Sequence, residues 1–361
     1  MKILVAQLDG ALLNRACARL VAHHRAAGDD VTFRRIGNAS ALENDLFESS
    51  YDRVFGSLIF ERTRELGHRF LERYPGATLG GTGWDLSVTL EDVGTPTEGR
   101  LDYSPWPLVS SSIGFLQRGC RLRCEFCHVP RAEGPVREVA TVADLWRGAP
   151  WPRDVVLLDN DPFGNPSWRE RVAEVHQGDY RVSWTQGINM RLVNDEAAEA
   201  LAGLFHADRL WNDSFDRRAI YTAWDSRPDE RTLFRGLDAI AQHGVSPRDV
   251  VVYVLVGFDG VGKPARPVHE DDLYRIAKLR EWGAFPYPMP YDRDTRVHEE
   301  RPDREGEERR ARTARGLVGL ARWVQGYDRR IPWAEWEAAG YRPEKLTRPR
   351  ARDAQQGRLF P

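Results

Sequence analysis

Nine consecutive residues, Gly119-Cys120-Arg121-Leu122-Arg123-Cys124-Glu125-Phe126-Cys127, contain three of the four cysteines in the chain. Their spacing is C-x3-C-x2-C, which makes a poor disulfide framework and a good metal framework. Soft thiolates select iron–sulfur clusters, Zn or Cu(I). Most four-iron clusters use four Cys ligands, so three ligands leave one iron with an open position. Such an iron can bind a small chelating ligand and pass it an electron.

Strand and helix patterns alternate on both sides of this segment. Helices are predicted between the strands, for example over 195–204, 230–243 and 270–281. Six β/α units are too few for a full eight-stranded barrel and enough for an open, partial one. We therefore expect an α/β fold with a partial (β/α)6 barrel over 108–295. The six predicted strands are 108–115, 154–158, 181–186, 219–224, 250–256 and 284–287.

A second, smaller α/β unit is predicted over 1–90, with the order β-α-β-β-α-β. Its strands are expected at 3–8, 31–36, 52–60 and 78–79, and its helices at 11–27 and 62–74. Residues 91–107 are rich in Pro and Gly, which predicts an extended linker.

The C-terminal part is predicted to be a helical extension over 296–340, followed by a flexible basic tail over 341–361. Residues 299–315 are dense in Glu and Arg, which indicates a solvated helix. Leu317, Leu320, Ala321 and Val324 then repeat at i, i+3, i+4 and i+7, so we expect one helix face to pack on the protein.

Composition limits the class of protein. The 361 residues suggest two domains, and 41% hydrophobic residues can bury a core, which excludes wholesale disorder and fibrous structure. The net charge of −2 gives no global basic field for nucleic acid. No apolar run approaches the ~18 residues of a membrane span. The stretch from Lys2 to Asp9 is interpreted as a first strand and not as a signal peptide, so a soluble cytoplasmic protein is expected.

The cysteine motif, with aromatic Phe126 before its last Cys and a strand ahead of it, resembles that of the radical S-adenosylmethionine (SAM) superfamily over about residues 108–292. The resemblance implies a [4Fe-4S] cluster on Cys120, Cys124 and Cys127. It also implies that SAM chelates the open iron and is cleaved reductively, giving a radical that abstracts hydrogen from a substrate. An electron donor such as a flavodoxin or ferredoxin is the implied partner.

Other positions of that superfamily suggest further SAM-binding residues. Where relatives often carry Gly-Gly-Glu, this chain has Asp159, Asn160 and Asp161, whose oxygens can accept ammonium hydrogen bonds. The alternative is an Asx-rich turn. Gln186 and Arg191 follow the third strand, and Arg191 suits a carboxylate, although a solvated surface turn is equally compatible. Asp225 and Ser226 end the fourth strand, where a helix cap is the alternative.

The last two barrel strands carry further segments of this kind. Residues 254–257 resemble the fifth-strand segment of the superfamily that packs against adenine, and residues 287–292 are expected to close the barrel and to face substrate. Core packing is the favoured interpretation of both, because apolar strand residues are usually core.

Residues 1–90 resemble the cobalamin-binding-like domain of some radical SAM enzymes. The Asp-x-His-x-x-Gly motif is missing, and Gln7-Leu8-Asp9-Gly10-Ala11 stands in its place. We therefore expect the scaffold without bound cobalamin, and His23 and His24 as solvated histidines at a helix end. Cys17 alone cannot hold an auxiliary cluster and is predicted to be core.

A structural zinc site with His128 or Cys17 as fourth ligand is the competing interpretation of the motif, which would make the chain a non-catalytic zinc-binding or interaction protein. Such sites usually have a second distant Cys/His pair, which the sequence lacks. Within the enzyme class the substrate stays open between a nucleic acid, a nucleotide and a small metabolite.

The tail ends in Gln356-Gly357-Arg358-Leu359-Phe360-Pro361, and this resembles the peptide that bacterial proteins insert into the DNA sliding clamp. Disorder, or folding back of Leu359 and Phe360, is the favoured alternative, because short motifs often match by chance.

Overall fold

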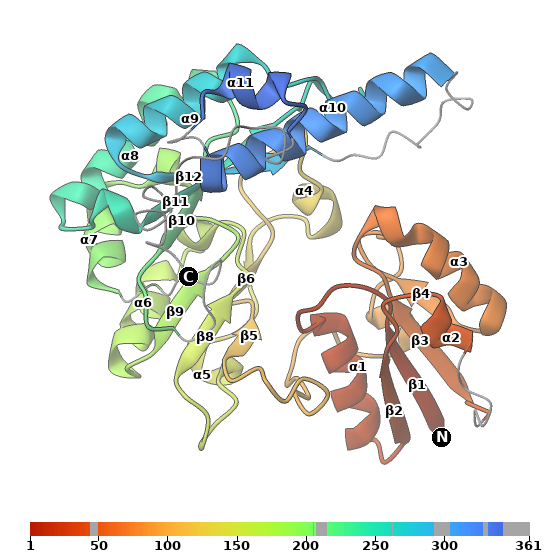
Figure 1. The fold of residues 1–361 in the computed structure, drawn as a ribbon. Helices are drawn as coiled ribbons and strands as arrows, with labels where there is room; N and C mark the ends of the chain where they lie inside the picture. Colours follow the sequence, from red (N-terminus) through yellow and green to blue (C-terminus); the bar gives the residue numbers. More distant parts are fainter. Residues whose placement is uncertain are drawn as a thin grey trace, which may run out of the picture.

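The computed structural model describes residues 1–43, 50–204, 206, 215–261, 263–291, 304–327 and 331–341. Its main sheets are parallel and are covered by helices, so the predicted α/β class is confirmed (Figure 1). The tail over 342–361, with its sliding-clamp motif, lies outside the described residues. Among the described residues, no helix has the length and apolar character that crossing a bilayer requires.

The N-terminal sheet has four parallel strands in the order β2-β1-β3-β4. The four predicted strands and two predicted helices occur in the predicted order, and the structure adds a short helix between the second and third strands. Leu4 in the central strand pairs with Thr32 on one side and Val54 on the other. The strands are β1 (Lys2–Gln7), β2 (Asp30–Arg35), β3 (Arg53–Ser57) and β4 (Thr78–Gly80), and the helices are α1 (Arg15–Ala26), the short α2 (Ser40–Glu43) and α3 (Arg64–Arg73).

Residues 91–107, which we call the strap, pack closely on this sheet and do not form a free linker. The strap contains one short 3-10 helix, η2 (Glu91–Val93). The Trp106 side chain is 4% exposed, packs at a tilt against the Phe33 ring at a centroid distance of 4.6 Å, and donates from Nε1 to Oε1 of Gln7 at 3.2 Å. The Arg19 guanidinium donates to the carbonyl oxygens of Pro96 and Arg100. The strap is therefore held on the domain by the buried Trp106 side chain and by two backbone carbonyl groups that accept hydrogen bonds from Arg19.

Two three-stranded parallel sheets follow, each in chain order. Isolated parallel bridges join Ile188 to Thr222 and Val182 to His206, between the two sheets. The first sheet contains β5 (Ser112–Gly114), β8 (Asp154–Leu157) and β9 (Arg181–Trp184), and the second contains β10 (Ile220–Ala223), β11 (Val250–Val256) and β12 (Phe285–Pro290).

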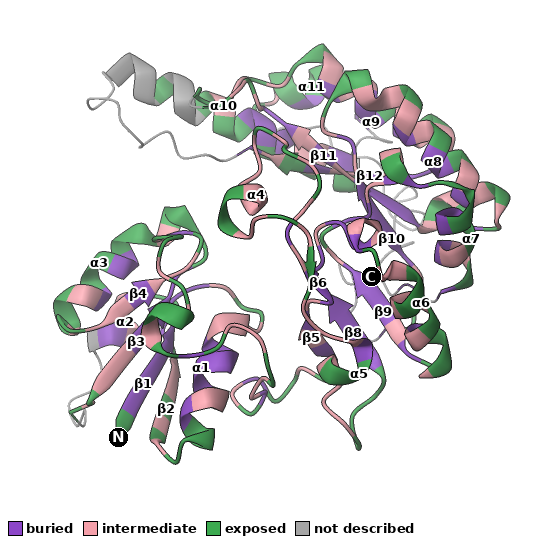
Figure 2. Ribbon diagram, turned by 180° about the vertical axis from the view of Figure 1, so that it is seen from behind, coloured by how far each residue is buried: buried purple, intermediate pink, exposed green. Residues whose placement is uncertain are grey.

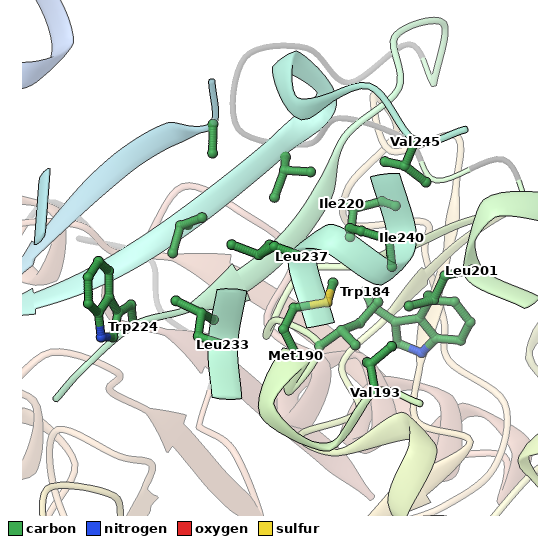
Figure 3. Close-up of a cluster of buried hydrophobic side chains, with 14 of the residues drawn as sticks. Trp184, Met190, Val193, Leu201, Ile220, Trp224, Leu233, Leu237, Ile240 and Val245 are labelled. Carbon is green, nitrogen blue, oxygen red and sulfur yellow. The ribbon is translucent and has the colours of Figure 1, made fainter. Parts of the chain in front are cut away.

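Strand β11 has apolar residues on both faces, as expected for a strand of a covered parallel sheet. Val250, Val252, Val254 and Val256 belong to a core cluster that also contains Leu233, Leu237 and Ile240 of α8 (Glu230–Gln242), shown in Figure 3. The opposite face carries Val251 and Tyr253, which cluster with aromatic residues of β10 and β12. Figure 2 shows β11 largely buried, with exposed residues on the neighbouring helix α8. The other covering helices are α6 (Trp168–Gln177), α7 (Asp195–Gly203) and α9 (Glu270–Trp282).

The strand predicted over 108–115 is shorter than expected. It begins at Ser112, while Leu108 is 97% exposed. The amide of Val109 donates to the carbonyl of Trp106, so the backbone turns there and cannot continue a strand ladder.

The C-terminal extension consists of α10 (Arg304–Arg322), a π-helical turn (Trp323–Tyr327) and α11 (Trp333–Ala338). Leu317, Leu320 and Val324 are buried and Ala321 is half-buried, so the predicted packing face is confirmed. This face lies against β12.

Candidate functional site

The three cysteines lie on the segment 119–128, which we call the cysteine loop. A short antiparallel pair, β6 (Gln117–Arg118) with β7 (Arg137–Glu138), brackets the loop together with α4 (Val129–Ala132). Gly119 begins the loop with a φ of +82°, and a Cβ there would lie 2.3 Å from the carbonyl oxygen of Pro135. The tight entry therefore requires glycine.

The thiols of the cysteine loop are half-buried and influence one another electrostatically. Burial raises the pKa of Cys120, and the charges of Asp161, Cys124 and Cys127 raise this pKa further. Burial also raises the pKa of Cys124, although the neighbouring Arg191 guanidinium opposes the shift. In the metal-free protein the raised pKa values of Cys120 and Cys124 favour their protonated thiols, so metal binding at these residues would release protons.

Cys17 is remote from this loop, as the sequence predicted. It is fully buried in the core of the N-terminal sheet, with Sγ 3.8 Å from the carbonyl oxygen of Ala6. The suggestion that Cys17 completes a zinc site is therefore wrong.

Asp159 faces inward after β8 and ties down the chain ahead of the cysteine loop. Its carboxylate accepts hydrogen bonds from the amides of Leu116 (2.7 Å) and Gln117 (3.0 Å), and from Nε1 of Trp184 (2.9 Å). Burial raises the pKa of Asp159 to about 6 despite these donors. The residue thus has a structural role that the sequence did not indicate.

Asp161 holds the cysteine loop itself. The Arg121 guanidinium, in the middle of the loop, donates to both carboxylate oxygens of Asp161, from Nε at 2.6 Å and from Nη2 at 3.0 Å. A Cβ on Gly164 would lie 2.3 Å from Oδ2 of Asp161 and 2.7 Å from Nε of Arg121. This bidentate pair is consequently possible only beside a glycine.

Asn160 reaches the ends of the same loop through Glu133. Its Nδ2 donates to Oε2 of Glu133 at 3.1 Å, and the same oxygen accepts the amide of Gly119 at 2.9 Å. The three predicted SAM ligands after β8 therefore anchor the loop before, within and after the cysteines. Asp161 precedes the 3-10 helix Pro162–Gly164 without a side-chain cap hydrogen bond, so the Asx-rich turn alternative is not supported there.

Arg191 follows β9 and approaches the loop from another strand. It donates to Oδ1 of Asn189 at 3.0 Å and to Asp229 at 2.6 Å, and it neighbours the Cys124 thiol. Arg191 lies in the 3-10 helix η4 (Met190–Leu192), against which α8 packs; a Cβ on Gly236 would lie 2.0 Å from the carbonyl oxygen of Met190. Arg191 is thus oriented by its neighbours and is not a freely solvated arginine. Gln186 is exposed.

Asp225 and Ser226 follow β10. The Leu255 amide lies 3.4 Å from Oδ1 of Asp225, and burial raises the pKa of Asp225 to about 6. Ser226 precedes the 3-10 helix η5 (Arg227–Asp229), but its side chain makes no cap hydrogen bond, so the helix-cap alternative is not supported. The Ser226 carbonyl instead accepts Nε1 of Trp224 at 2.8 Å.

Phe126 brings the cysteine loop into contact with the ends of β11 and β12. Its ring meets Phe258 edge-on at a centroid distance of 5.6 Å, and Phe258 meets Tyr291 at 4.9 Å. The Tyr291 hydroxyl is buried and has no hydrogen-bond partner within the described part of the chain. Position 292, the last of the segment predicted to face substrate, lies outside it.

Side chains from the carboxyl ends of five parallel strands thus gather around one thiol-bearing loop. Arg121, Glu133 and Phe258 were missed at the sequence level, where they appear as ordinary charged or apolar residues. Among the described residues, no three His, Cys, Asp or Glu side chains are arranged to hold one metal ion. A scan against protein-family models and a search of curated proteins found no match for this chain.

The N-terminal sheet carries a different arrangement at its own carboxyl edge. Asp9, in the segment that replaces the missing histidine motif, accepts hydrogen bonds from the amides of Ile59 and Phe60 and from the Thr63 hydroxyl. It thereby joins the loops after β1 and β3, where an α/β sheet usually binds ligands.

The position of His24 differs from the sequence prediction of a solvated histidine at a helix end. It is 3% exposed, stacks on Phe55 and pairs through Nδ1 with Asp29 at 2.7 Å. It is therefore a packed residue and not a solvated histidine at a helix end.

Proposed function

We propose that the chain is a radical SAM enzyme, with the six strands of its two C-terminal sheets forming a partial (β/α)6 barrel. The observation that carries the proposal is the C-x3-C-x2-C loop, held at the carboxyl ends of parallel strands by the residues that follow those strands. Active sites of parallel β/α folds lie at this edge.

The ligand chemistry of the donor set fits an iron–sulfur cluster, and binding would bring the three thiols around a common position that they do not surround in the described structure. Three thiols on one loop are soft ligands, and the charges of Cys124 and Cys127 raise the pKa of Cys120. When bound, a [4Fe-4S] cluster with SAM supplies a 5′-deoxyadenosyl radical that abstracts hydrogen from substrate. The chain's own part is to hold and shield the reacting groups.

The protein residues would divide this work. Asp161 and Glu133 fix the loop, and Phe126 with Phe258 covers it with apolar surface that excludes water. Arg191 places a fixed positive charge beside Cys124, where it favours the thiolate over the thiol. Asp225 offers a half-buried carboxyl group for the amino group or ribose of SAM.

The test is anaerobic reconstitution of the full chain. We expect roughly four iron and four sulfide per chain, broad visible absorption, and release of 5′-deoxyadenosine with reductant and SAM. Replacing Cys120, Cys124 or Cys127 by Ala should abolish this release, while Cys17→Ala, in the distant core, should retain it. Cleavage of SAM by any of the three loop variants would refute the assignment.

The same metal analysis addresses the competing class. Stoichiometric zinc without iron uptake would instead support a non-catalytic zinc-binding or interaction protein. Co-purified cobalamin would show a binding mode for the N-terminal domain that the missing histidine motif does not predict.

The proposed partner is an electron donor such as a flavodoxin or ferredoxin. The proposed location is the cytoplasm, where the thiols stay reduced. The sliding-clamp motif remains a separate proposal. The test is calorimetric titration of a clamp with a peptide of residues 350–361, beside a control peptide with Leu359→Ala and Phe360→Ala. Negligible heat from both peptides would refute the sliding-clamp proposal.

A further inference from the structure

A continuous chain of charged side chains connects the N-terminal domain to the cysteine loop. Arg15, the first residue of α1, pairs with Oε2 of Glu98 in the strap. The other oxygen of Glu98 lies 4.0 Å from Nη1 of Arg118, and Arg118 pairs with Glu133 at 3.2 Å. Glu133 in turn accepts the amide of Gly119, the residue before Cys120.

These groups are largely removed from solvent. The side chains of Arg15, Arg118 and Glu133 are between 12% and 18% exposed, and that of Glu98 is 31% exposed. Both guanidinium groups also lie over the Phe115 ring, at 5.1 Å for Arg15 and 4.1 Å for Arg118. The ring therefore has one arginine from each domain beside it.

Glu98 is the carboxylate that these two arginines share. Burial lowers the pKa of Arg15, the Glu98 charge opposes this shift, and the Arg118 charge reinforces it. Without the Glu98 charge, two like charges would face each other in a poorly solvated interface. The arginines would then separate, and Arg118 lies next to the first residue of the cysteine loop.

We propose that Glu98 is a positioning residue through which the N-terminal domain sets the conformation of the cysteine loop. The proposal deepens and rests on the proposed function, because a correctly held loop matters only if its thiols bind a cluster. In this role the N-terminal domain needs no ligand of its own. It stabilises the conformation of the cysteine loop through the contacts of Glu98.

The first experiment uses the metal-free full chain. The alkylation rate of each cysteine is measured by peptide mapping in the wild type, in Glu98→Gln and in Glu91→Gln. Glu91 is the matched control, since it lies in the same strap and its carboxylate binds Thr97. We expect several-fold faster alkylation of Cys120, Cys124 and Cys127 in Glu98→Gln alone, with Glu98→Asp partly restoring the wild-type rates.

Cys17 reports on global opening in the same map, because it is fully buried. Equal loop-thiol rates in Glu98→Gln and wild type would overturn the proposal. So would a parallel acceleration of Cys17, which would show general destabilisation and not positioning.

The second experiment separates this inference from the proposed function. In reconstituted protein, Glu98→Gln should lose iron to a chelator several-fold faster than Glu91→Gln, and should show a shifted cluster midpoint potential. If the wild type takes up no iron, the proposed function fails while the alkylation result still decides the role of Glu98. If iron loss and potential match the control, the positioning role is refuted.

Discussion

Gly164 lies where Asp161 and Arg121 meet, and it leaves no room for a methyl group. We expect Gly164→Ala to break this pair, to lower the free energy of unfolding by about 1–3 kcal/mol as overpacking does, and to reduce iron loading. Gly76→Ala is the control, because a Cβ at Gly76 meets nothing within 4 Å. Chemical denaturation and iron analysis measure both effects, and equal behaviour of the two variants would contradict the anchoring role of Asp161.

His206 predicts how stability depends on pH. It is 1% exposed, its Nε2 lies 3.0 Å from the carbonyl oxygen of Leu201, and burial lowers its pKa to about 3. Between pH 6.5 and pH 3 the imidazole binds a proton in the unfolded state but not in the folded state. The contribution of the neutral, buried His206 to the free energy of unfolding is therefore fully present above the unfolded pKa of about 6.5 and is lost as pH falls toward 3. The loss approaches about 1.4 kcal/mol per pH unit.

The measurement compares wild type with His206→Gln, which keeps a hydrogen-bond donor but cannot titrate. Urea denaturation at pH 7 and pH 5 should show a steeper loss of stability for the wild type. The same pH slope in both proteins would show that His206 is protonated in the folded state.

Helix α10 is expected to owe its place to one buried face. Leu320 is fully buried, whereas its neighbour Val318 is 44% exposed. Leu320→Ala should lower the free energy of unfolding by about 2–5 kcal/mol, and Val318→Ala should change it by less than about 0.5 kcal/mol. Comparable losses in thermal or chemical denaturation would mean that the helix packs through another face.

Elements with strong periodicity were predictable from the sequence. The strand Val250–Val256 is a continuous apolar run, and the helices α8 and α9 carry apolar residues at helical spacing; each matches its predicted range within one residue. The strand predicted over 108–115 was too long, since the turn at Trp106 and Val109 depends on packing of the strap, which involves residues far apart in sequence.

The candidate site was predictable in its chemistry and not in its support. The three cysteines could be identified as candidate metal ligands because they lie close together in the sequence at a characteristic spacing. The tasks of Asp159 and Asp161 depend on Gln117 and Arg121, which lie about forty positions earlier in the chain. Sequence position places these carboxyl groups at a strand end but does not say which donors meet them there.

The molecule as a whole depends on the strap to hold its N-terminal domain. Trp106→Ala should remove a buried indole, its hydrogen bond to Gln7 and its contact with Phe33, and so cost about 3–5 kcal/mol in that domain. Leu108→Ala, two positions away and 97% exposed, is the control. Limited proteolysis should cleave the Trp106 variant faster within residues 91–107. Equal cleavage of both variants would indicate that the strap is held by other contacts.

The position of the N-terminal sheet early in the sequence has a consequence for biosynthesis. Its four strands end by Gly80 and the strap that packs on them ends at residue 107, both before Cys120, so this domain can complete its folding before the cysteines leave the ribosomal exit tunnel. Arg15 and the strap then stand ready when Arg118 emerges. We expect the nascent thiols to dock against a finished surface as they leave the exit tunnel, which shortens the time that a cysteine-rich peptide is exposed to oxidants before iron is delivered.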